Sequence, residues 1–511
     1  MVESDIRDPA TGARVRTLDD AVDEVPPVGS GPKLLIRPAT LPTPSRTAVA
    51  RRLSQAVAVT TRHLAPLVAR GVRRRTVDDA AVALALRGIF DDLGGSFAKF
   101  GQLIGSSPSL FGEEVAAAFR STLDAVPAVP FAEVEATVTD ELGLALDDLF
   151  AEFDPVPVAA ASLAVVHQAV LPDGRKVAVK ILRPGIEHAM AVDLAVIGPL
   201  FGFLGRQVAI GIAGELPSLV SGLAEQLAEE VDLRNEARSV RWFEHLRLAM
   251  RLDKVRVPLP VEGYVTKRVL VMDFFDGVAV DDTEAVEAMG IDPAPLVQDC
   301  VKAWFATAIC TGAFHGDIHA GNLMVTTAGE LGVIDWGIVG RMDAGTQHFF
   351  RRVIEGALGD ESAWMDVWDH VKAIYGPALQ ERLGADDALM AQMVRMQIEP
   401  LFIRPFGEVN LAELLLTPDI GVDDGAARVA EGGERPQIST FELWRTERRR
   451  RREILDSGVG ETSFDRGMFL LSKQLVYFDR YGKMFFPDVP VLWDTDAYER
   501  LLAEPIVPAS S

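Results

Sequence analysis

The sequence predicts an α+β protein in which strands come first and helices follow; the part built on the antiparallel sheet is called here the small lobe and the larger, mainly helical part the large lobe. Two observations support this prediction. Alternating, β-branched segments are concentrated between residues 156 and 274, and helical periodicity with a few short strand-like runs follows them. Helical periodicity also precedes residue 150, so we expect a helical extension before the sheet. The chain has no regular repeat of the kind that indicates a solenoid.

The composition is that of a globular protein. The 511 residues are 48% hydrophobic and 24% charged. A formal net charge of −23 argues against a nucleic-acid partner, because binding to a polyanion depends on a surplus of basic residues. The 2 cysteines, Cys300 and Cys310, are too few for a disulfide framework or a four-thiolate zinc site, and they favour a reducing, cytoplasmic compartment.

Residues 1–44 are expected to form a disordered tail, because Asp, Glu, Gly and Pro are mixed there without sustained periodicity. The first residues also lack the basic and apolar regions of a secretory signal, so we expect a cytoplasmic protein. The most apolar stretch, Leu194–Gly205, is shorter than the roughly 20 residues that a membrane-spanning helix needs. We therefore predict a buried or interfacial helix there and no transmembrane span.

Residues 45–150 make up the expected helical extension, and its first part is basic. From Ser45 to Val77 arginines recur without any acidic residue between them. Apolar residues recur in the same segment at helical spacing: Leu53, Val57, Leu64, Val68 and Val72. Such a helix either lies on an anionic membrane surface, which would make the protein peripheral to a membrane, or packs against the rest of the chain. The pattern leaves both interpretations open.

Residues 151–275 are expected to form the small lobe. Two apolar runs within Val156–Leu182 flank the turn sequence Pro172-Asp173-Gly174, which predicts a β-hairpin. A helical insertion follows as far as about residue 250. A second strand pair is then expected around Val255–Tyr264 and Lys267–Phe274.

Residues 276–511 are expected to form the large lobe. A helix at Pro293–Cys310 leads into a loop, His315–Asn322, and two short strands follow at Leu323–Val325 and Leu331–Ile334. The remainder is mainly helical. We expect an inserted mobile loop at about 406–440, where Gly, Asp, Glu and Pro are frequent.

Lys180 is the first candidate for chemistry. It ends the alternating run Val177-Ala178-Val179-Lys180 on the second strand of the hairpin. A buried lysine requires an anion beside it, either a phosphate or a carboxylate. Taken alone, the pattern is more often that of a surface lysine on an edge strand.

Asp317, Asn322 and Asp335 form a second group of candidates. Asp317 and Asn322 lie in the loop sequence HGDIHAGN, and Asp335 begins the sequence Asp-Trp-Gly after the next strand pair. Loops at the ends of adjacent strands would bring these side chains together, and their oxygens suit Mg²⁺. The alternative is that Asp and Asn merely occupy turns. The upstream Lys180 argues against that alternative.

These segments resemble the signature motifs of protein kinases in order and local spacing. The resemblance implies a protein-kinase-like fold that binds ATP or ADP with Mg²⁺, or with Mn²⁺ in its place. Lys180 would hold the nucleotide phosphates, and Asp317 would be the catalytic aspartate that orients the acceptor hydroxyl. Asn322 and Asp335 would hold the metal.

The chain also departs from ordinary kinases. Alanines replace the glycine-rich loop, in the segment Ala159, Ala160, Ala161 and Ser162, and this loop cannot wrap phosphates as glycines do. Gly316 stands where the catalytic loop has an arginine, and Trp336 stands where the metal motif has a phenylalanine.

With these departures the chain closely resembles the ABC1/UbiB/ADCK family of atypical kinases, also called AarF-like proteins. The family's K-x-G-Q motif is present as Lys99 to Gln102, its alanine-rich loop as Ala159–Ser162, and its E-x-D motif as Glu230 to Asp232, with Glu236 following. The resemblance extends over roughly Leu86 to Met342.

The resemblance implies further roles. Glu236 would pair with Lys180, and the backbone near Asp273 and Phe274 would bind adenine, beside the alanine loop. Lys99 and Gln102, which share one helix face, would cover the nucleotide cleft. Lys99 would approach Glu230 in a regulatory ion-pair group that includes Asp232.

The leading functional hypothesis is an ATP-dependent phosphotransferase or ATPase that acts on or near a membrane lipid or an isoprenoid-quinone precursor rather than on proteins. A pseudokinase-like regulator that binds nucleotide without transferring phosphate is the main alternative. A third interpretation takes His315, Asp317, His319 and Asp335 as a metallohydrolase site. The sequence indicates neither the acceptor nor the oligomeric state.

Overall fold

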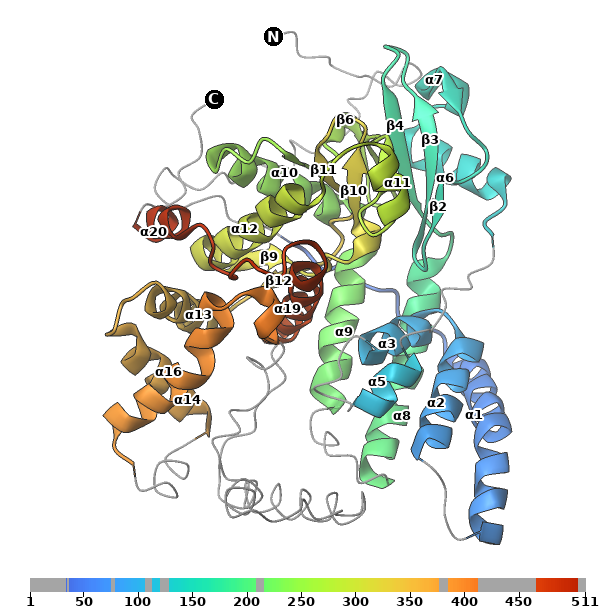
Figure 1. Ribbon diagram of the computed structural model, residues 1–511. Helices are drawn as coiled ribbons and strands as arrows, with labels where there is room; N and C mark the ends of the chain where they lie inside the picture. The colour runs from blue at the N-terminus through green and yellow to red at the C-terminus, as the bar shows by residue number, and fades with distance from the viewer. Residues whose placement is uncertain are drawn as a thin grey trace.

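The structure, a computed structural model of the 511-residue chain, describes residues 34, 36–74, 79–105, 113–119, 128–207, 216–375, 385–411 and 466–503. The described part has the predicted α+β architecture, with a small antiparallel sheet and a mainly helical second lobe (Figure 1).

Helices form the N-terminal extension, as expected. Their bounds are α1 Arg46–Arg74, α2 Asp79–Leu93, α3 Ser96–Gly105, α5 Glu113–Phe119, α6 Phe131–Leu142 and α7 Leu146–Leu149. The break between α6 and α7 falls at Gly143, which adopts a left-handed conformation with φ 74° and caps α6. Phe97 and Phe100 of α3 lie in one core cluster with Leu270 of the small-lobe sheet, so the extension and the small lobe share a core.

The basic helix α1 packs along α2 and α8. Its expected apolar stripe is partly wrong. Leu53 and Val57 are 46% and 58% exposed, whereas Ala56 and Leu67 are buried in their place. One face of α1 therefore packs against neighbouring helices, and a different face exposes the apolar side chains of Leu53 and Val57.

The small lobe contains a six-stranded sheet in the order β1-β3-β4-β7-β6, with β2 beside β3. The strands are β1 Glu152–Phe153, β2 Ala159–Ala160, β3 Ala164–Val170, β4 Lys176–Leu182, β6 Pro260–Val265 and β7 Val269–Asp273. The predicted hairpin is confirmed as β3 and β4. Its turn places Gly174 at φ 88°, a conformation that favours glycine.

Lys180 lies on the central strand of this sheet rather than at an edge. It faces Val166 across the β3–β4 ladder and Leu270 across the β4–β7 ladder, and the residue is 9% exposed. The interpretation of Lys180 as a surface residue on an edge strand is therefore wrong, because β4 is paired on both sides.

A helical insertion separates β4 from the helix that carries Glu236. It consists of α8 Ile186–Gln207 and α9 Leu216–Glu230, and α10 Leu233–Ala249 follows. In Figure 1, α8 and α9 stand beside α3 and α5 of the extension, below the sheet. Val196 and Ile197 of the apolar stretch in α8 are buried, as expected. Among the described residues no helix is long and apolar enough to cross a membrane.

The large lobe contains two small sheets and a set of helices. One sheet has the order β5-β11-β10-β8, and in the other β9 pairs with β12. The strands are β5 Val255–Arg256, β8 Gly277–Ala279, β9 Ala313–His315, β10 Leu323–Thr326, β11 Leu331–Val333 and β12 Val339–Arg341. The helices are α11 Thr283–Ala288, α12 Ala294–Thr311, α13 Ala344–Ala357, α14 Ala363–Tyr375, α16 Asp387–Ile403, α19 Arg466–Phe485 and α20 Thr495–Ala503, with short 3-10 helices at Ala320–Asn322 and Phe406–Glu408.

Three of the expected segment boundaries change. Val255 and Arg256, expected in a small-lobe strand, form β5 beside β11 in the large-lobe sheet, so that small-lobe strand begins at Pro260. The backbone N–H of Ala39 donates to Ala228, and that of Arg37 donates to the Asn235 side chain, so the end of the predicted tail is bound to α9 and α10. Phe406 and Leu411 are fully buried, so the expected inserted loop does not begin at 406. Residues 412–440 lie outside the described residues.

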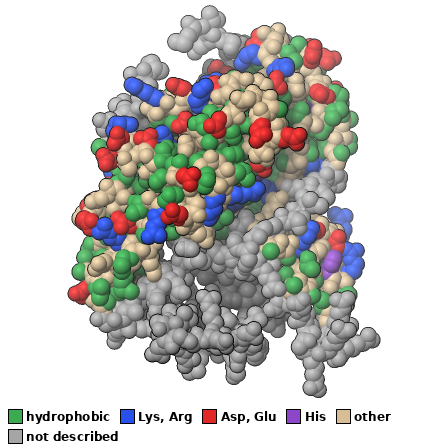
Figure 2. Space-filling model, viewed as in Figure 1, with side chains coloured by type: hydrophobic (Ala, Val, Ile, Leu, Met, Phe, Trp, Pro, Cys, Tyr) green, Lys and Arg blue, Asp and Glu red, His purple; other side chains and the backbone are tan. Residues whose placement is uncertain are grey.

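Charged side chains of both signs are interspersed with hydrophobic ones over the face drawn in Figure 2. The net charge of −23 is therefore not gathered into one acidic patch on this face.

Candidate functional site

Lys180 is held between two carboxylates. Its Nζ lies 2.8 Å from Oε1 of Glu236 and 3.0 Å from Oδ2 of Asp335. The Glu236 side chain is only 3% exposed, whereas that of Asp335 is 42% exposed. Lys180 thus joins the small-lobe sheet, helix α10 and the segment after β11 at a point where Asp335 remains open to solvent.

Burial and charge set the protonation states in this group. Burial lowers the pKa of Lys180, but the charges of Asp335 and Glu236 raise it by a larger amount. The pKa of Lys180 therefore lies above its usual range. Burial raises the pKa of Glu236 to about 7, although Lys180 opposes the shift. Burial also raises the pKa of Asp335, but Lys180 and the N–H of Gly337 lower it more, so Asp335 stays ionised.

Asp232 has a structural position beside this group. Its side chain caps the N-terminus of α10 by accepting from the N–H of Arg234, and it pairs with the Arg234 guanidinium at 2.6 Å. The E-x-D aspartate therefore fixes the start of the helix that presents Glu236 in its first turn.

His315 joins the catalytic-loop segment to the Asp-Trp-Gly segment. Its Nδ1 accepts the N–H of Asp317 at 3.0 Å, so Nε2 carries the proton and donates to the carbonyl oxygen of Asp335 at 2.7 Å. Burial lowers the pKa of His315 to about 4, which keeps the ring neutral. Because both ring nitrogens are used, His315 cannot ligate a metal. The metallohydrolase interpretation therefore loses one of its four proposed ligands.

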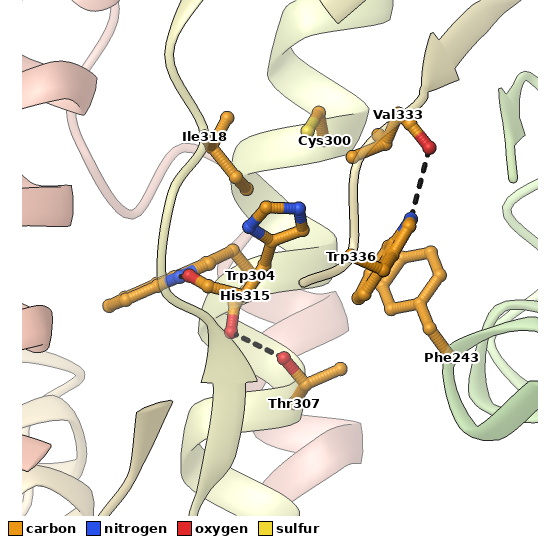
Figure 3. Close-up of a pocket in the computed structure, with 8 residues that line it drawn as sticks. All are labelled: Phe243, Cys300, Trp304, Thr307, His315, Ile318, Val333 and Trp336. Atoms are coloured by element: carbon orange, nitrogen blue, oxygen red, sulfur yellow. Dashed lines mark hydrogen bonds between the residues drawn. The ribbon is translucent and has the colours of Figure 1, made fainter. Parts of the chain in front are cut away.

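Trp336 packs between α10 and the catalytic loop. Its ring lies 4.5 Å, centroid to centroid, from both Phe243 and His315, and its Nε1 donates to the carbonyl oxygen of Val333 at 3.0 Å (Figure 3). These rings line a small pocket that Cys300 and Trp304 also border. Tryptophan therefore fits in the phenylalanine position because its N–H finds a backbone acceptor.

Asp317 is paired with a lysine that the sequence did not indicate. Nζ of Lys473, on α19, lies 2.5 Å from Oδ1 of Asp317, and His319 Nε2 lies 3.9 Å from Oδ2. Burial raises the pKa of Asp317, but Lys473, His319 and Lys99 together lower it more, so the pKa lies below its usual value. The carboxylate is therefore ionised.

Asn322 and Asp335 lie at the same end of the β10–β11 pair, as predicted. The backbone N–H of Ile334 donates to the Asn322 carbonyl at 3.0 Å, and Asn322 Nδ2 donates to the carbonyl of Asp317 at 2.9 Å. This bond fixes the amide and leaves its Oδ1 as the acceptor. The amide oxygen and the open, ionised Asp335 carboxylate are hard oxygen donors at the same end of the strand pair, and donors of this type fit Mg²⁺ together with phosphate and water ligands.

Lys99 extends from the N-terminal extension to the same site. Its Nζ lies 3.2 Å from Oε2 of Glu230, and Gln226 Nε2 donates to the other Glu230 oxygen at 2.9 Å. Burial lowers the pKa of Lys99, but Glu230 and Asp317 raise it more, so the ammonium stays charged. Helix α3 thus brings a cation close enough to Asp317 and Asp335 for their charges to affect its pKa. Gln102 lies on the same helix.

The remaining predicted residues lie farther from the ion pairs. Ala159 and Ala160 form the exposed strand β2, which pairs with β3 next to Val166, the residue that faces Lys180. Arg183 Nε donates to the carbonyl of Ala161 at 2.9 Å, and Ser162 is buried.

Asp273 ends β7 and uses both its N–H and its carboxylate in hydrogen bonds with Leu259. Phe274 packs at the edge of the core that the extension shares with the small lobe. The roles of these residues in nucleotide binding stay predictions.

Sequence reasoning missed the residues that α19 contributes. Besides Lys473, Arg466 pairs at 2.7 Å with Glu229, whose side chain is 3% exposed and which also pairs with Arg341 of β12. No local pattern marks these contacts, because they join segments far apart in the chain. The Lys473-Gln474 pair in a largely apolar run was the available signal, and it does not indicate which residues the two side chains contact.

Comparisons with known proteins bear on the family of this chain. The family model of the ABC1 atypical kinase-like domain matches residues 121–365, which include Lys180, Glu236 and Asp317. An uncharacterized protein of Mycobacterium tuberculosis is 32% identical over 401 residues, covering 78% of this chain and 73% of that protein. A Marinobacter nauticus protein named as a probable protein kinase UbiB is 28% identical over 418 residues, covering 80% of this chain and 68% of that protein. A solved structure of a Mycobacterium tuberculosis protein complexed with erythromycin aligns with a TM-score of 0.42 at 21% identity, covering 80% of this chain and 96% of that one.

Proposed function

This chain belongs to the ABC1 atypical kinase-like family, and on that premise we propose that it binds ATP with Mg²⁺ and works as a phosphotransferase or ATPase. One observation carries the proposal. Lys180, a buried and charged lysine on the central strand, is oriented by its ion pair with Glu236, and its second partner, Asp335, remains open to solvent. Lys180 is thereby placed to meet phosphate oxygens.

Lys180, Asn322 and Asp335 would hold the nucleotide's phosphates and its metal. Lys180 supplies the positive charge on the small-lobe side, with Glu236 fixing its direction. Asn322 and Asp335 supply oxygen ligands on the large-lobe side. Mg²⁺, when bound, neutralises the charge that develops on the phosphates.

Asp317 is proposed as the catalytic aspartate. It is ionised, and it lies in the loop that His315 and Asn322 fix relative to Asp335. In the proposed reaction the acceptor hydroxyl attacks the γ-phosphorus, the bond to the β-phosphate oxygen breaks and ADP leaves. The hydroxyl proton goes to the Asp317 carboxylate. Water takes the place of the hydroxyl if the protein is an ATPase.

The proposed acceptor is a membrane lipid or an isoprenoid-quinone precursor, and two features support this choice. Helix α3 contributes Lys99 to the site through its pair with Glu230, and a helix in that position would hinder a protein substrate. The exposed Leu53 and Val57 of α1 stand among the exposed arginines Arg46 and Arg51, which suits contact with an anionic membrane.

A nucleotide-binding regulator is the second candidate. Two features favour the regulator. The alanine strand β2 stands in the place of a glycine-rich loop, and Lys99 of α3 pairs with Glu230 beside the site. The complete set of Lys180, Asp317, Asn322 and Asp335 favours the enzyme, because a regulator has no need of an ionised, positioned Asp317.

The two candidates are separated by measuring ATP binding and ADP release with Mg²⁺ for the wild type and Asp317→Asn. Each protein is assayed alone, with anionic vesicles and with a phenolic headgroup mimic. The proposal expects turnover in the wild type that falls at least 100-fold in Asp317→Asn, since general-base catalysis contributes on the order of 10²–10⁴. Equal turnover in both proteins would sink the catalytic assignment, and binding without turnover under every condition would establish the regulator.

A further inference from the structure

Helix α19 contacts the catalytic loop at three neighbouring points. Lys473 Nζ binds Asp317 Oδ1 at 2.5 Å, and Gln474 Oε1 accepts the N–H of Ile318 at 2.8 Å. The hydroxyl of Tyr481 donates to the carbonyl of Ile318 at 3.2 Å. Backbone and side chain of the loop are therefore both held by a helix that begins at Arg466, outside the residues 121–365 matched by the family model.

The glycine at position 316 is explained by the same helix. A Cβ on Gly316 would lie 2.9 Å from Ile338 Cγ2 and 3.3 Å from Leu470 Cδ1 of α19. The Gly316 N–H donates to the carbonyl of Ile338. A larger side chain, such as the arginine that ordinary kinases carry at this position, has no room here. Helix α19 supplies its own cation, Lys473, to the aspartate.

Lys473 and Asp317 are only 14% and 20% exposed, so each depends on the other to offset the cost of burying its charge. Lys473 binds one oxygen of the carboxylate, and the other oxygen faces His319. Rotation of the carboxylate is thereby restricted. A general base needs this restriction, because its free lone pair must point at the acceptor hydroxyl.

We propose that Lys473 is the positioning residue for Asp317, a cation supplied from the C-terminal helix α19 in place of one within the catalytic loop. The inference rests on the proposed phosphotransfer or ATPase function. It assigns Lys473 to the acceptor side of the site, whereas Lys180 serves the nucleotide side. Loss of Lys473 therefore lowers kcat and leaves KM for ATP nearly unchanged.

The test compares the steady-state kinetics of ADP formation in the wild type, Lys473→Met, Lys473→Arg and a control, Lys483→Met. Lys483 lies on the same helix in an exposed pair with Asp479. Lys473→Met is expected to lower kcat about 100-fold, the usual cost of misplacing a reacting group by about 1 Å, with KM for ATP within about threefold. Lys473→Arg recovers part of the loss, because it keeps the charge, and Lys483→Met behaves as wild type.

Lys473→Met is also combined with Asp317→Asn. The double variant is expected to turn over no more slowly than Asp317→Asn alone, because Lys473 acts through the Asp317 carboxylate. Thermal unfolding without nucleotide checks that each variant folds. If Lys473→Met does not fold, Lys473→Gln, which removes the charge but keeps a donor, is measured in its place.

Four results would overturn the inference. The kcat of Lys473→Met could be unchanged, or it could be raised. The fall in kcat could be accompanied by a similar rise in KM for ATP that Lys473→Arg does not reverse, or the double variant could turn over more slowly than Asp317→Asn. If the Lys473→Met variant has the kcat of the wild type while Asp317→Asn turns over slowly, only the role of Lys473 is contradicted. Absence of turnover in the wild type contradicts the proposed function itself.

Discussion

Nζ of Lys99, on α3, lies 3.2 Å from Oε2 of Glu230, the last residue of α9. The pair joins the N-terminal extension to the helical insertion of the small lobe. It also places a charged ammonium near Asp317 and Asp335, whose charges help to raise the pKa of Lys99. The extension is thus connected to the candidate site electrostatically as well as by the core that includes Phe97 and Phe100.

Replacing Lys99 by methionine is expected to destabilise the protein by about 3 kcal/mol, because Glu230 would remain a buried charge with Gln226 as its partner. Chemical denaturation followed by tryptophan fluorescence measures the change. The double variant Lys99→Met/Glu230→Gln serves as the control and should recover part of the loss. Unchanged stability in Lys99→Met would mean that the ion pair does not hold α3 in place.

The fold could be predicted from the sequence wherever its signal is local. The β3–β4 hairpin follows from alternating apolar residues around Pro172-Asp173-Gly174, and α12 follows from a long apolar helical run. The exposed face of α1 could not be predicted, because Leu53 and Val57 fit a helical apolar stripe equally well whether or not a neighbour covers them. Only the packing of α2 and α8 decides which face is buried.

The candidate site could be predicted in part for the same reason. Asp317, Asn322 and Asp335 are close in sequence and are joined by short strands, so their proximity follows from the spacing. The Lys180–Glu236 pair spans 56 residues and required a resemblance to known kinases. The Lys473–Asp317 pair spans 156 residues and lies outside every motif, so only the folded chain reveals it.

Gly316→Ala is expected to cost about 1–3 kcal/mol of stability and to slow turnover, because the added methyl group would press on Ile338 and Leu470 beside the catalytic loop. Thermal unfolding and ADP release measure the two effects. Gly198→Ala in α8 is the matched control, since no atom lies within 4 Å of its Cβ position. Within a helix alanine is more favourable than glycine by up to about 1 kcal/mol, so the control substitution should be neutral or stabilising. A Gly316→Ala protein as stable and active as the control would contradict this explanation.

Membrane contact through α1 is tested with Leu53→Ser/Val57→Ser. Both side chains are exposed, so the double variant should fold normally. It is expected to sediment less with anionic vesicles than the wild type does, because the apolar part of the contact is lost. Leu389→Ser/Met396→Ser removes two exposed apolar side chains from α16 and should sediment as wild type. An equal effect of both double variants would argue for general surface hydrophobicity instead of α1.

Burial raises the pKa of the Cys300 thiol to about 12 and that of Cys310 to about 11. A pKa raised above the pH keeps a thiol protonated, so both cysteines should react slowly with a disulfide reagent at pH 8 in the native protein. Both should react quickly once the protein is unfolded, where their pKa returns to about 8.5. Rapid native labelling that persists in Cys310→Ser would show that Cys300 is accessible and that the pocket it lines with Trp336 opens.

The most direct test of the proposed site is titration calorimetry of ATP with Mg²⁺ on the wild type, Lys180→Met and Lys176→Met. Lys176 lies on the same strand as Lys180, in an exposed pair with Asp276. The account predicts binding by the wild type and by Lys176→Met, with at least about tenfold weaker binding by Lys180→Met, since a charge-assisted phosphate contact is worth roughly 1.5–3 kcal/mol. Equal affinity of all three proteins, or no binding by any of them, would contradict it.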